Sequence, residues 1–169
     1  MARRDSATGA STPALRALTE ASVEFVTHAY SHDPRAISTG ALSYGLEAAA
    51  ALGVDADRVF KTLITEVDSQ LTVAVVPVTT QLDLKALARA RDGSRAALAE
   101  VATAERVTGY LAGGISPFGQ KRPLPTVVDE SALMFDTVYV SAGRRGLDVE
   151  VTPDTLIELT EATVADIAR

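Results

Sequence analysis

The sequence predicts an α+β fold in which a mixed, mostly antiparallel and barrel-like β-sheet is flanked by helices. Three observations support this prediction. Short runs rich in β-branched residues follow one another, two of them at hairpin spacing, and helix-start signals lie between the runs. The chain has 169 residues, 47% of them hydrophobic, which suffices for one sizeable core. No internal repeat or low-complexity tract interrupts it, so we expect a single domain over residues 12–169.

Helices are expected where a capping residue precedes an apolar stripe. The first and last begin with the same pair, Thr12-Pro13 and Thr152-Pro153, in which threonine can cap the helix and proline takes its first position. An alanine-rich helix is expected over residues 44–52, capped by Ser43 and ended by Gly53. Further helical segments are expected over residues 82–91, in one or two turns within residues 94–108, and from residue 153 to the end of the chain.

Strands are expected where valine, isoleucine, threonine and aromatic residues cluster between turn signals. The runs that meet this description are residues 23–30, 59–67, 71–76, 126–129, 137–141 and 147–151. The second and third predict a hairpin, because only Asp68, Ser69 and Gln70 separate them. Residues 35–43 are polar and residues 112–125 are rich in glycine and proline, so both segments are expected to be irregular.

The composition excludes several kinds of site. The sequence contains 0 cysteines, which rules out a disulfide scaffold, a thiolate metal site and a cysteine nucleophile, and which fits a cytoplasmic protein. Its net charge of −6 repels phosphate backbones, so we expect no DNA binding, and RNA must meet a local basic patch or arrive with a partner. Residues 1–11 predict a disordered arm rather than a signal peptide, and no stretch is long enough to span a membrane.

Lys61 is an unusual residue in an apolar strand. Alternation along residues 59–67 places it on the face of Leu63 and Val67, whereas Thr62 lies on the other face. An ammonium on such a face must lose water or meet an anion. Two interpretations stay open: a strand-end lysine that reaches water along its aliphatic stem, or a cation directed at a phosphate, a carboxylate or a developing oxyanion.

The glycine-rich segment 113–119 is a second candidate for ligand binding. Gly113 and Gly114 permit positive φ and let a ligand approach backbone N–H groups, which can hold an oxygen or a phosphate. The segment has neither the spacing of a phosphate-binding P-loop nor that of a dinucleotide fingerprint. A simple connecting loop is the alternative.

Two basic pairs, Lys121-Arg122 and Arg144-Arg145, are candidate RNA contacts on an otherwise acidic chain. The alternative is that these are turn residues whose charges are simply solvated, which is the usual case for any single basic pair. The RNA-binding interpretation would be favoured only if both pairs lay around one common pocket.

The two histidines do not predict a metal site. His28 and His32 are four residues apart, but Asp33-Pro34 and the strand-like flank argue against the helix that such a ligand pair needs. A serine nucleophile is equally unsupported, because no Gly-x-Ser-x-Gly elbow occurs. We therefore expect hydrogen-bonded histidines and no metal.

Five segments occur in an order typical of one family, and the glycine motif among them is highly specific. They are residues 28–34 (HAYSHDP), 44–48 (YGLEA), 58–63 (RVFKTL), 108–121 (TGYLAGGISPFGQK) and 139–147 (YVSAGRRGL). In this order they resemble the YbaK/EbsC family of trans-acting aminoacyl-tRNA deacylases. The resemblance runs nearly from end to end of the chain.

The resemblance implies an enzyme with a mixed β-barrel and with no metal, cofactor or protein nucleophile. In the family, the thiol of a misattached cysteine attacks its own ester carbonyl and releases a cyclic thiolactone, a lyase-type cleavage; release by water would make the enzyme a hydrolase. An aminoacyl ester is already activated, so a pocket that orients it and stabilises charge suffices. The implied substrates are Cys-tRNA(Pro) and, secondarily, Cys-tRNA(Cys), and the implied partner is prolyl-tRNA synthetase, which can supply tRNA binding.

The resemblance also implies roles for individual residues. Lys61 would stabilise or orient the charged end of the substrate, Thr62 would orient the amino acid, and Gly113 and Gly114 would offer backbone N–H groups to the ester. The side-chain pocket would consist of Tyr30 and Tyr44, with Ser141 and Asp148 at its far wall. Tyr44 stands where the family pattern has phenylalanine, and residues 35–43 form a longer stretch than usual, so both bear on specificity.

Two alternatives stay open. The same fold with another specificity, such as Ala-tRNA(Pro), is one, because a pocket discriminates by only ~1–3 kcal/mol per methylene. A non-catalytic module that binds a nucleotide or an amino-acid adduct is the other. The intact Lys61, Gly113 and Gly114 argue against the second alternative.

Overall fold

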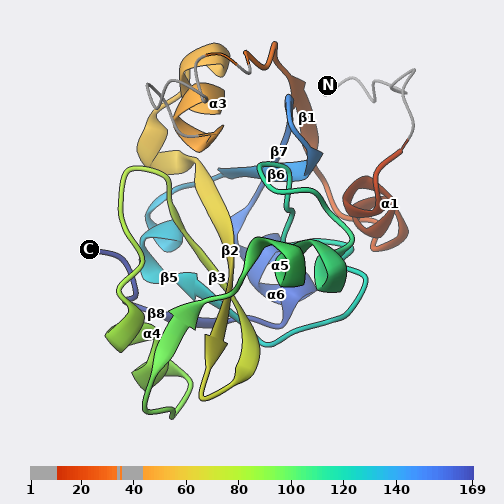
Figure 1. Ribbon diagram of the computed structural model, residues 1–169. Helices are drawn as coiled ribbons and strands as arrows, with labels where there is room; N and C mark the ends of the chain where they lie inside the picture. Colours follow the sequence, from red (N-terminus) through yellow and green to blue (C-terminus); the bar gives the residue numbers. More distant parts are fainter. Residues whose placement is uncertain (1–10, 34, 36–43) are drawn as a thin grey trace.

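The computed structural model describes residues 11–33, 35 and 44–169 (Figure 1). Its strands form two sheets, one of three strands in the order β1-β7-β6 and one of five strands in the order β4-β2-β3-β5-β8. Four of the strand pairs are antiparallel and two, β3 with β5 and β5 with β8, are parallel. The predicted α+β class with a mixed, mostly antiparallel sheet is therefore confirmed, although the strands form two sheets rather than one closed barrel.

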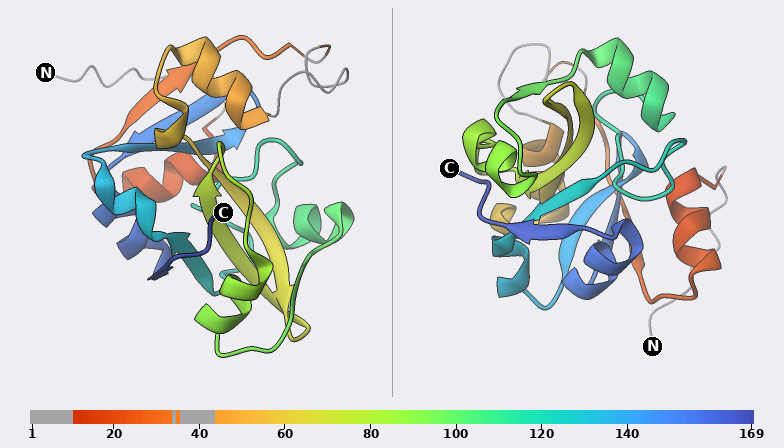
Figure 2. Two further views of the ribbon diagram at one scale, coloured as in Figure 1. Left: turned by 90° about the vertical axis from the view of Figure 1, so that its left-hand side faces the viewer. Right: turned by 90° about the horizontal axis from the view of Figure 1, so that it is seen from below.

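The three-stranded sheet contains β1 (Val26–Ala29), β6 (Val138–Arg144) and β7 (Leu147–Val151). Alternation along β6 and β7 sends their valines to the main core, whereas Tyr139 and Asp148 belong to the opposite face. That opposite face is covered by α3 (Tyr44–Leu52), which packs on Tyr139. On the core side lie α1 (Pro13–Glu20) and α6 (Pro153–Thr160), as the left view of Figure 2 shows.

The five-stranded sheet is built around the predicted hairpin of β2 (Phe60–Val67) and β3 (Gln70–Pro77). Its tight turn is made by Asp68 and Ser69, both with positive φ. β4 (Ala96–Leu98) pairs with β2, and β5 (Thr126–Asp129) and β8 (Thr163–Ala165) extend the other edge. The remaining elements are α4 (Leu84–Ala90), α5 (Val101–Thr108), and the short 3₁₀ helices η1 (Ala56–Arg58) and η2 (Glu130–Met134).

The main core lies between the two sheets. Ile64 and Val75 of the larger sheet and Val140 and Val149 of the smaller one are at most 5% exposed and belong to one cluster. At one end the two sheets also meet through an isolated parallel bridge between Val59 and Tyr139. This end of the interface, beneath α3, is where the candidate site lies.

Two strands were not predicted from the sequence. β4 is built from alanine and leucine, which favour helix, and its pairing with β2 overrides that preference. β8 follows α6, so the prediction that the chain ends in helix is wrong: Glu161 takes a left-handed conformation and the chain turns into the sheet edge. The helix predicted from residue 82 begins at Leu84, because Leu82 instead forms a bridge with Ala168.

Some predictions concern residues outside the described part of the chain. The arm expected over residues 1–11 lies there except for Ser11, as do the cap Ser43 and most of the irregular segment 35–43. Among the residues that the structure describes, no helix combines the length and the apolar character that a membrane crossing requires.

Candidate functional site

A cavity of about 210 Å³ opens beneath α3, between the start of β2, the glycine-rich loop and the face of β6 and β7 that points away from the main core. It is smaller than the ~300–1,000 Å³ of pockets for drug-sized ligands, so it suits a small group. The predicted site residues that line it are Tyr30, Tyr44, Lys61, Thr62, Gly113, Ser141 and Asp148. Apolar lining residues that were not predicted are Gly45, Ala48, Val59, Phe60, Leu63 and Ile115.

Lys61 enters the cavity wall from the second position of β2. Its Nζ donates a 2.8 Å hydrogen bond to the backbone carbonyl of Thr80, three residues after the end of β3. Burial lowers the pKa of the Lys61 ammonium. Lys61 takes part in none of the ion pairs found among the described residues, so its charge is neutralised by no carboxylate there. An anionic or oxygen-bearing ligand would meet a cation whose charge is balanced by none of these carboxylates.

Asp148 lies in the same cavity, on β7, with only 5% of its surface exposed. Burial raises the pKa of its carboxyl to about 7, so the group is partly protonated near neutral pH. A cationic ligand would favour its ionised form.

Tyr30 follows β1 and lines the wall beside Asp148. Burial, together with the nearby carboxyls of Asp148 and Glu47, raises the pKa of Tyr30 to about 12, against a hydrogen bond from the backbone of Gly146 that lowers it. The phenol therefore stays protonated and can act as a hydrogen-bond donor inside the cavity.

Two hydroxyls complete the polar lining. The hydroxyl of Thr62 is buried and has no hydrogen-bond partner among the described residues. The Oγ of Ser141 accepts a 3.1 Å bond from the N–H of Gly143 and so is held by its own turn. An unpaired buried hydroxyl is costly unless a ligand or water meets it, so Thr62 is a ready contact for a bound group.

The glycine-rich loop closes the cavity on one side. Gly113 has φ +84°, and a Cβ there would lie 2.9 Å from the Tyr44 ring and 2.7 Å from Nε of Arg145. Gly114 instead allows the loop to touch the β6–β7 turn, because a Cβ there would lie 2.8 Å from the Cα of Arg144. The N–H of Gly114 donates to the carbonyl of Leu111 at 3.0 Å, and Gly114 is not among the lining residues. Only Gly113 of the predicted pair therefore faces the cavity.

The two basic pairs are not brought together. Lys121 and Arg122 are exposed, and their backbone N–H groups bond to Thr108 and Val107 at the end of α5. Arg144 ends β6 and Arg145 begins the β6–β7 turn, beside the glycine loop. Only the second pair therefore adjoins the cavity.

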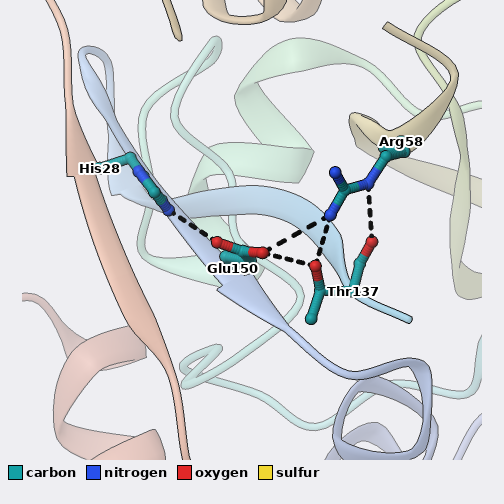
Figure 3. Close-up of polar contacts among 4 residues, drawn as sticks. All are labelled: His28, Arg58, Thr137 and Glu150. Carbon is teal, nitrogen blue, oxygen red and sulfur yellow. Dashed lines mark hydrogen bonds and ion pairs between the residues drawn. The ribbon is translucent and has the colours of Figure 1, made fainter. Parts of the chain in front are cut away.

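Next to the cavity, four residues form a polar network, of which the sequence predicted only that His28 is hydrogen-bonded (Figure 3). Glu150 of β7 accepts hydrogen bonds from His28 of β1, at 3.0 Å, and from the hydroxyl of Thr137. Arg58 of η1 donates to that hydroxyl and, at 3.1 Å, to the Thr137 carbonyl, and its guanidinium lies 5.1 Å above the Tyr139 ring. The network thus ties the segment that precedes Lys61 to the strand that carries Asp148.

The network could have been anticipated in part. Glu150 stands two residues after Asp148, so period-2 alternation alone places both carboxyls on one face of β7. Burial by itself would raise the pKa of Glu150, but hydrogen bonds from Thr137 and His28 and the charges of His28 and Arg58 outweigh it and lower that pKa. The residues that bind Glu150, namely His28, Thr137 and Arg58, lie in distant segments of the chain, so only the folded structure identifies them.

The prediction of hydrogen-bonded histidines is confirmed. His28 contacts Glu150, and Nδ1 of His32 lies 2.9 Å from a carboxylate oxygen of Glu47, a buried residue of α3. Within the described ranges, no three histidine or carboxylate side chains gather as a metal-binding group. Neither histidine is among the residues that line the cavity.

The family model described as an aminoacyl-tRNA editing domain matches residues 43–159, a range that contains all the lining residues except Tyr30. A protein of Enterococcus faecalis (strain ATCC 700802 / V583), named "Putative Cys-tRNA(Pro)/Cys-tRNA(Cys) deacylase EbsC", is 38% identical over 120 residues, which cover 70% of this chain and 73% of that protein. A Bacillus subtilis (strain 168) protein, "Uncharacterized protein YwhH", is 28% identical over 119 residues, covering 70% of this chain and 75% of the relative.

Solved structures share the whole fold. A crystal structure of "a putative trans-editing enzyme for prolyl tRNA synthetase" has a TM-score of 0.81 and 24% identity, covering 96% of this chain and 99% of the other. The crystal structure of "hypothetical protein APE2540" has a TM-score of 0.80 and 25% identity, covering 93% and 99%. At 24% identity, the similarity to the trans-editing enzyme shows a shared fold and says nothing about which substrate this chain uses.

Proposed function

The chain belongs to the YbaK/EbsC family of aminoacyl-tRNA editing domains, and we propose that the amino acid it removes is cysteine misattached to tRNA(Pro), with Cys-tRNA(Cys) as a second substrate. Membership of the family makes it an aminoacyl-tRNA deacylase. The proposal concerns which ester is cleaved and how.

One observation carries the proposal: Lys61 and Asp148 line a single small cavity whose lining residues include no cysteine and no histidine. The sequence has 0 cysteines, and both histidines are hydrogen-bonded to glutamates outside the lining. A site that holds charge and orients a group, with neither a cysteine nor a serine–histidine pair in its lining, suits a substrate that carries its own nucleophile. The thiol of a cysteinyl ester is such a nucleophile.

In the proposed reaction the cysteine sulfur attacks the carbonyl carbon of its own ester and forms a carbon–sulfur bond. The carbon–oxygen bond to the terminal ribose then breaks, and the ribose oxygen takes the proton that left the thiol. The products are a cyclic thiolactone and free tRNA, so no water is consumed in this step and the enzyme acts as a lyase. Later hydrolysis of the thiolactone would yield free cysteine.

The lining residues take the following roles in this proposal. The Lys61 ammonium and the N–H of Gly113 stabilise the negative charge that develops on the carbonyl oxygen. Asp148, whose pKa burial raises to about 7, pairs with the α-ammonium of the substrate. Thr62 offers its unpaired hydroxyl, and Tyr30, Tyr44 and Ser141 enclose the side chain.

The deciding experiment compares Cys-tRNA(Pro), Ala-tRNA(Pro) and Ser-tRNA(Ser) as substrates of the wild-type protein and the Lys61→Ala variant. Selective loss of the cysteinyl ester, with the thiolactone seen by mass spectrometry and both lost in the variant, supports the proposal. Cleavage of the alanyl ester overturns thiol assistance and indicates a water-activating group instead. If no ester is cleaved, with or without prolyl-tRNA synthetase, a binding module becomes the better explanation.

We also propose that prolyl-tRNA synthetase, in the cytoplasm, presents the tRNA to this protein. The support is electrostatic: the net charge is −6, and of the four predicted tRNA contacts only Arg144 and Arg145 adjoin the cavity. Weak tRNA binding alone, which the synthetase strengthens at physiological salt, is the expected result in a binding assay. Tight binding of tRNA to the isolated protein would contradict this proposal.

A further inference from the structure

The side chain of Arg145 spans the rim of the cavity. It leaves the turn between β6 and β7, and its Nε and one terminal nitrogen both donate to the carbonyl of Ala112, at 3.0 and 2.7 Å. Its guanidinium carbon also lies 4.7 Å from the centroid of the Tyr44 ring. One exposed arginine thus contacts the glycine loop and α3 at the same time.

These contacts fit the shape of a guanidinium. The planar fork can donate two bonds to one carbonyl oxygen while its face rests on an aromatic ring. Gly113 completes the packing, since a Cβ at that position would lie 2.7 Å from Nε of Arg145 and 2.9 Å from the Tyr44 ring. This one side chain therefore links two walls of the cavity, the glycine loop and α3, to the β6–β7 turn.

We propose that Arg145 is a positioning residue, which fixes the Gly113 N–H and the Tyr44 ring against each other and so sets the shape of the substrate cavity. The inference rests on the proposed function for its catalytic consequence, but the local order it describes exists in the free protein. Arg145 acts through Gly113 and Tyr44 and need not touch the substrate.

The alternative role for Arg145 is contact with tRNA phosphates. Its neighbour Arg144 offers a matched comparison, because it is exposed, carries the same charge and directly precedes the turn, but the atoms that it brings closest to Gly114 are backbone atoms. If charge were the whole role, removing either arginine would weaken tRNA binding to the same degree and the loss would depend on salt.

The test is single-turnover deacylation of Cys-tRNA(Pro) by Arg145→Ala, Arg145→Lys and Arg144→Ala proteins. For Arg145→Ala we expect the rate at saturating enzyme to fall about tenfold, since a small misplacement of the ester impairs attack, with little change in the half-saturating concentration. Arg145→Lys should restore little of the lost rate, because lysine keeps the positive charge but lacks the planar guanidinium that donates two bonds to Ala112. Arg144→Ala should change the half-saturating concentration and not the saturated rate.

A second measurement needs no activity. Amide ¹⁵N relaxation reports the motion of the Gly113 N–H, which should increase in Arg145→Ala and not in Arg144→Ala. Unchanged Gly113 relaxation, or full rescue of the rate by lysine, would overturn the positioning role. The two proposals can fail separately. If the wild-type protein cleaves no cysteinyl ester, but Arg145→Ala still increases the motion of the Gly113 N–H, the proposed function is refuted and the positioning role of Arg145 stands.

Discussion

The Lys61 ammonium donates a 2.8 Å hydrogen bond to the backbone carbonyl of Thr80, its one hydrogen-bond partner among the described residues. A half-buried cation held only by a carbonyl dipole keeps most of its charge available to a ligand. Lys61 is also among the residues that line the cavity, so its charge is within reach of a bound group. This position favours the second of the two interpretations that the sequence left open.

Replacing Lys61 by methionine should therefore affect catalysis far more than stability. We expect the deacylation rate to fall about 100-fold, the usual scale for loss of one group that stabilises a developing oxyanion. The free energy of unfolding should change by no more than about 1 kcal/mol. The variant loses the hydrogen bond to Thr80, but it no longer has to bury an ammonium group, and the two effects oppose each other. The same substitution at Lys85, an exposed residue of α4, should alter neither quantity.

Replacing Asp148 by asparagine should change how stability depends on pH. Burial raises the pKa of Asp148 from 3.8 to about 7, so the folded protein binds a proton that the unfolded chain releases between these values. The wild type must then lose stability as pH rises from about 4 to 7, by up to about 4 kcal/mol, and the variant should lack this loss.

Denaturant titrations from pH 4 to 8 measure this difference. At pH 8 the Asp148→Asn protein should be the more stable one, yet less active, because it cannot pair with a substrate ammonium. Asp136→Asn, which changes an exposed carboxylate, is the matched control. Parallel stability profiles for wild type and Asp148→Asn would contradict the role of burial.

Replacing Gly113 by alanine should have two costs, backbone strain from the positive φ and steric contacts of the added Cβ. Replacing Gly53 by alanine should have only the first of them. Gly113 and Gly53 both have positive φ, but a Cβ at Gly53 meets nothing within 4 Å, whereas at Gly113 it meets Arg145 and Tyr44. Gly53→Ala should thus lose about 1 kcal/mol from backbone strain alone and remain fully active.

For Gly113→Ala we expect a larger loss of stability and a fall of at least about tenfold in activity, because the loop must move away from Tyr44. Thermal unfolding and single-turnover assays of both variants test this. Equal effects of the two substitutions would show that the contacts around Gly113 do not define the cavity.

Replacing Glu150 by glutamine should weaken the network that links η1 to β7. The pKa of Glu150 is lowered from 4.5, because its hydrogen bonds and the neighbouring charges outweigh the effect of burial. A lowered pKa means that the ionised group stabilises the fold above about pH 5, and that this contribution disappears as pH falls through the folded pKa.

We therefore expect Glu150→Gln to cost about 1 kcal/mol at pH 7, where Thr137 and Arg58 lose a charged acceptor, and to cost less as the pH falls below about 4. Glu24→Gln, at an exposed position before β1, controls for the loss of one negative charge. A difference between wild type and Glu150→Gln that is the same at pH 7 and pH 3.5 would be inconsistent with an ionic contribution.

The strands with strong local patterns were predictable. β5 and β7 lie at the residues expected from the sequence, since alternating or continuous valine-rich runs between turns have few other stable conformations. β4 and β8 were not, because alanine-rich or short segments become strands only when a neighbouring strand edge accepts their hydrogen bonds. Residue types likewise pointed to Lys61 and Gly113, which are unusual in their local setting.

By itself, the sequence determined the α+β class, the apolar face of each long strand and the family, because these follow from local periodicity and from motifs contiguous in the chain. Only the tertiary structure decided which residues share the cavity. It separated Gly114 from Gly113, paired Lys61 with Thr80 and joined Arg58 of η1 to Glu150 of β7, which are far apart in the sequence. Such contacts depend on how two sheets pack, and packing is a property of the whole core rather than of any one segment.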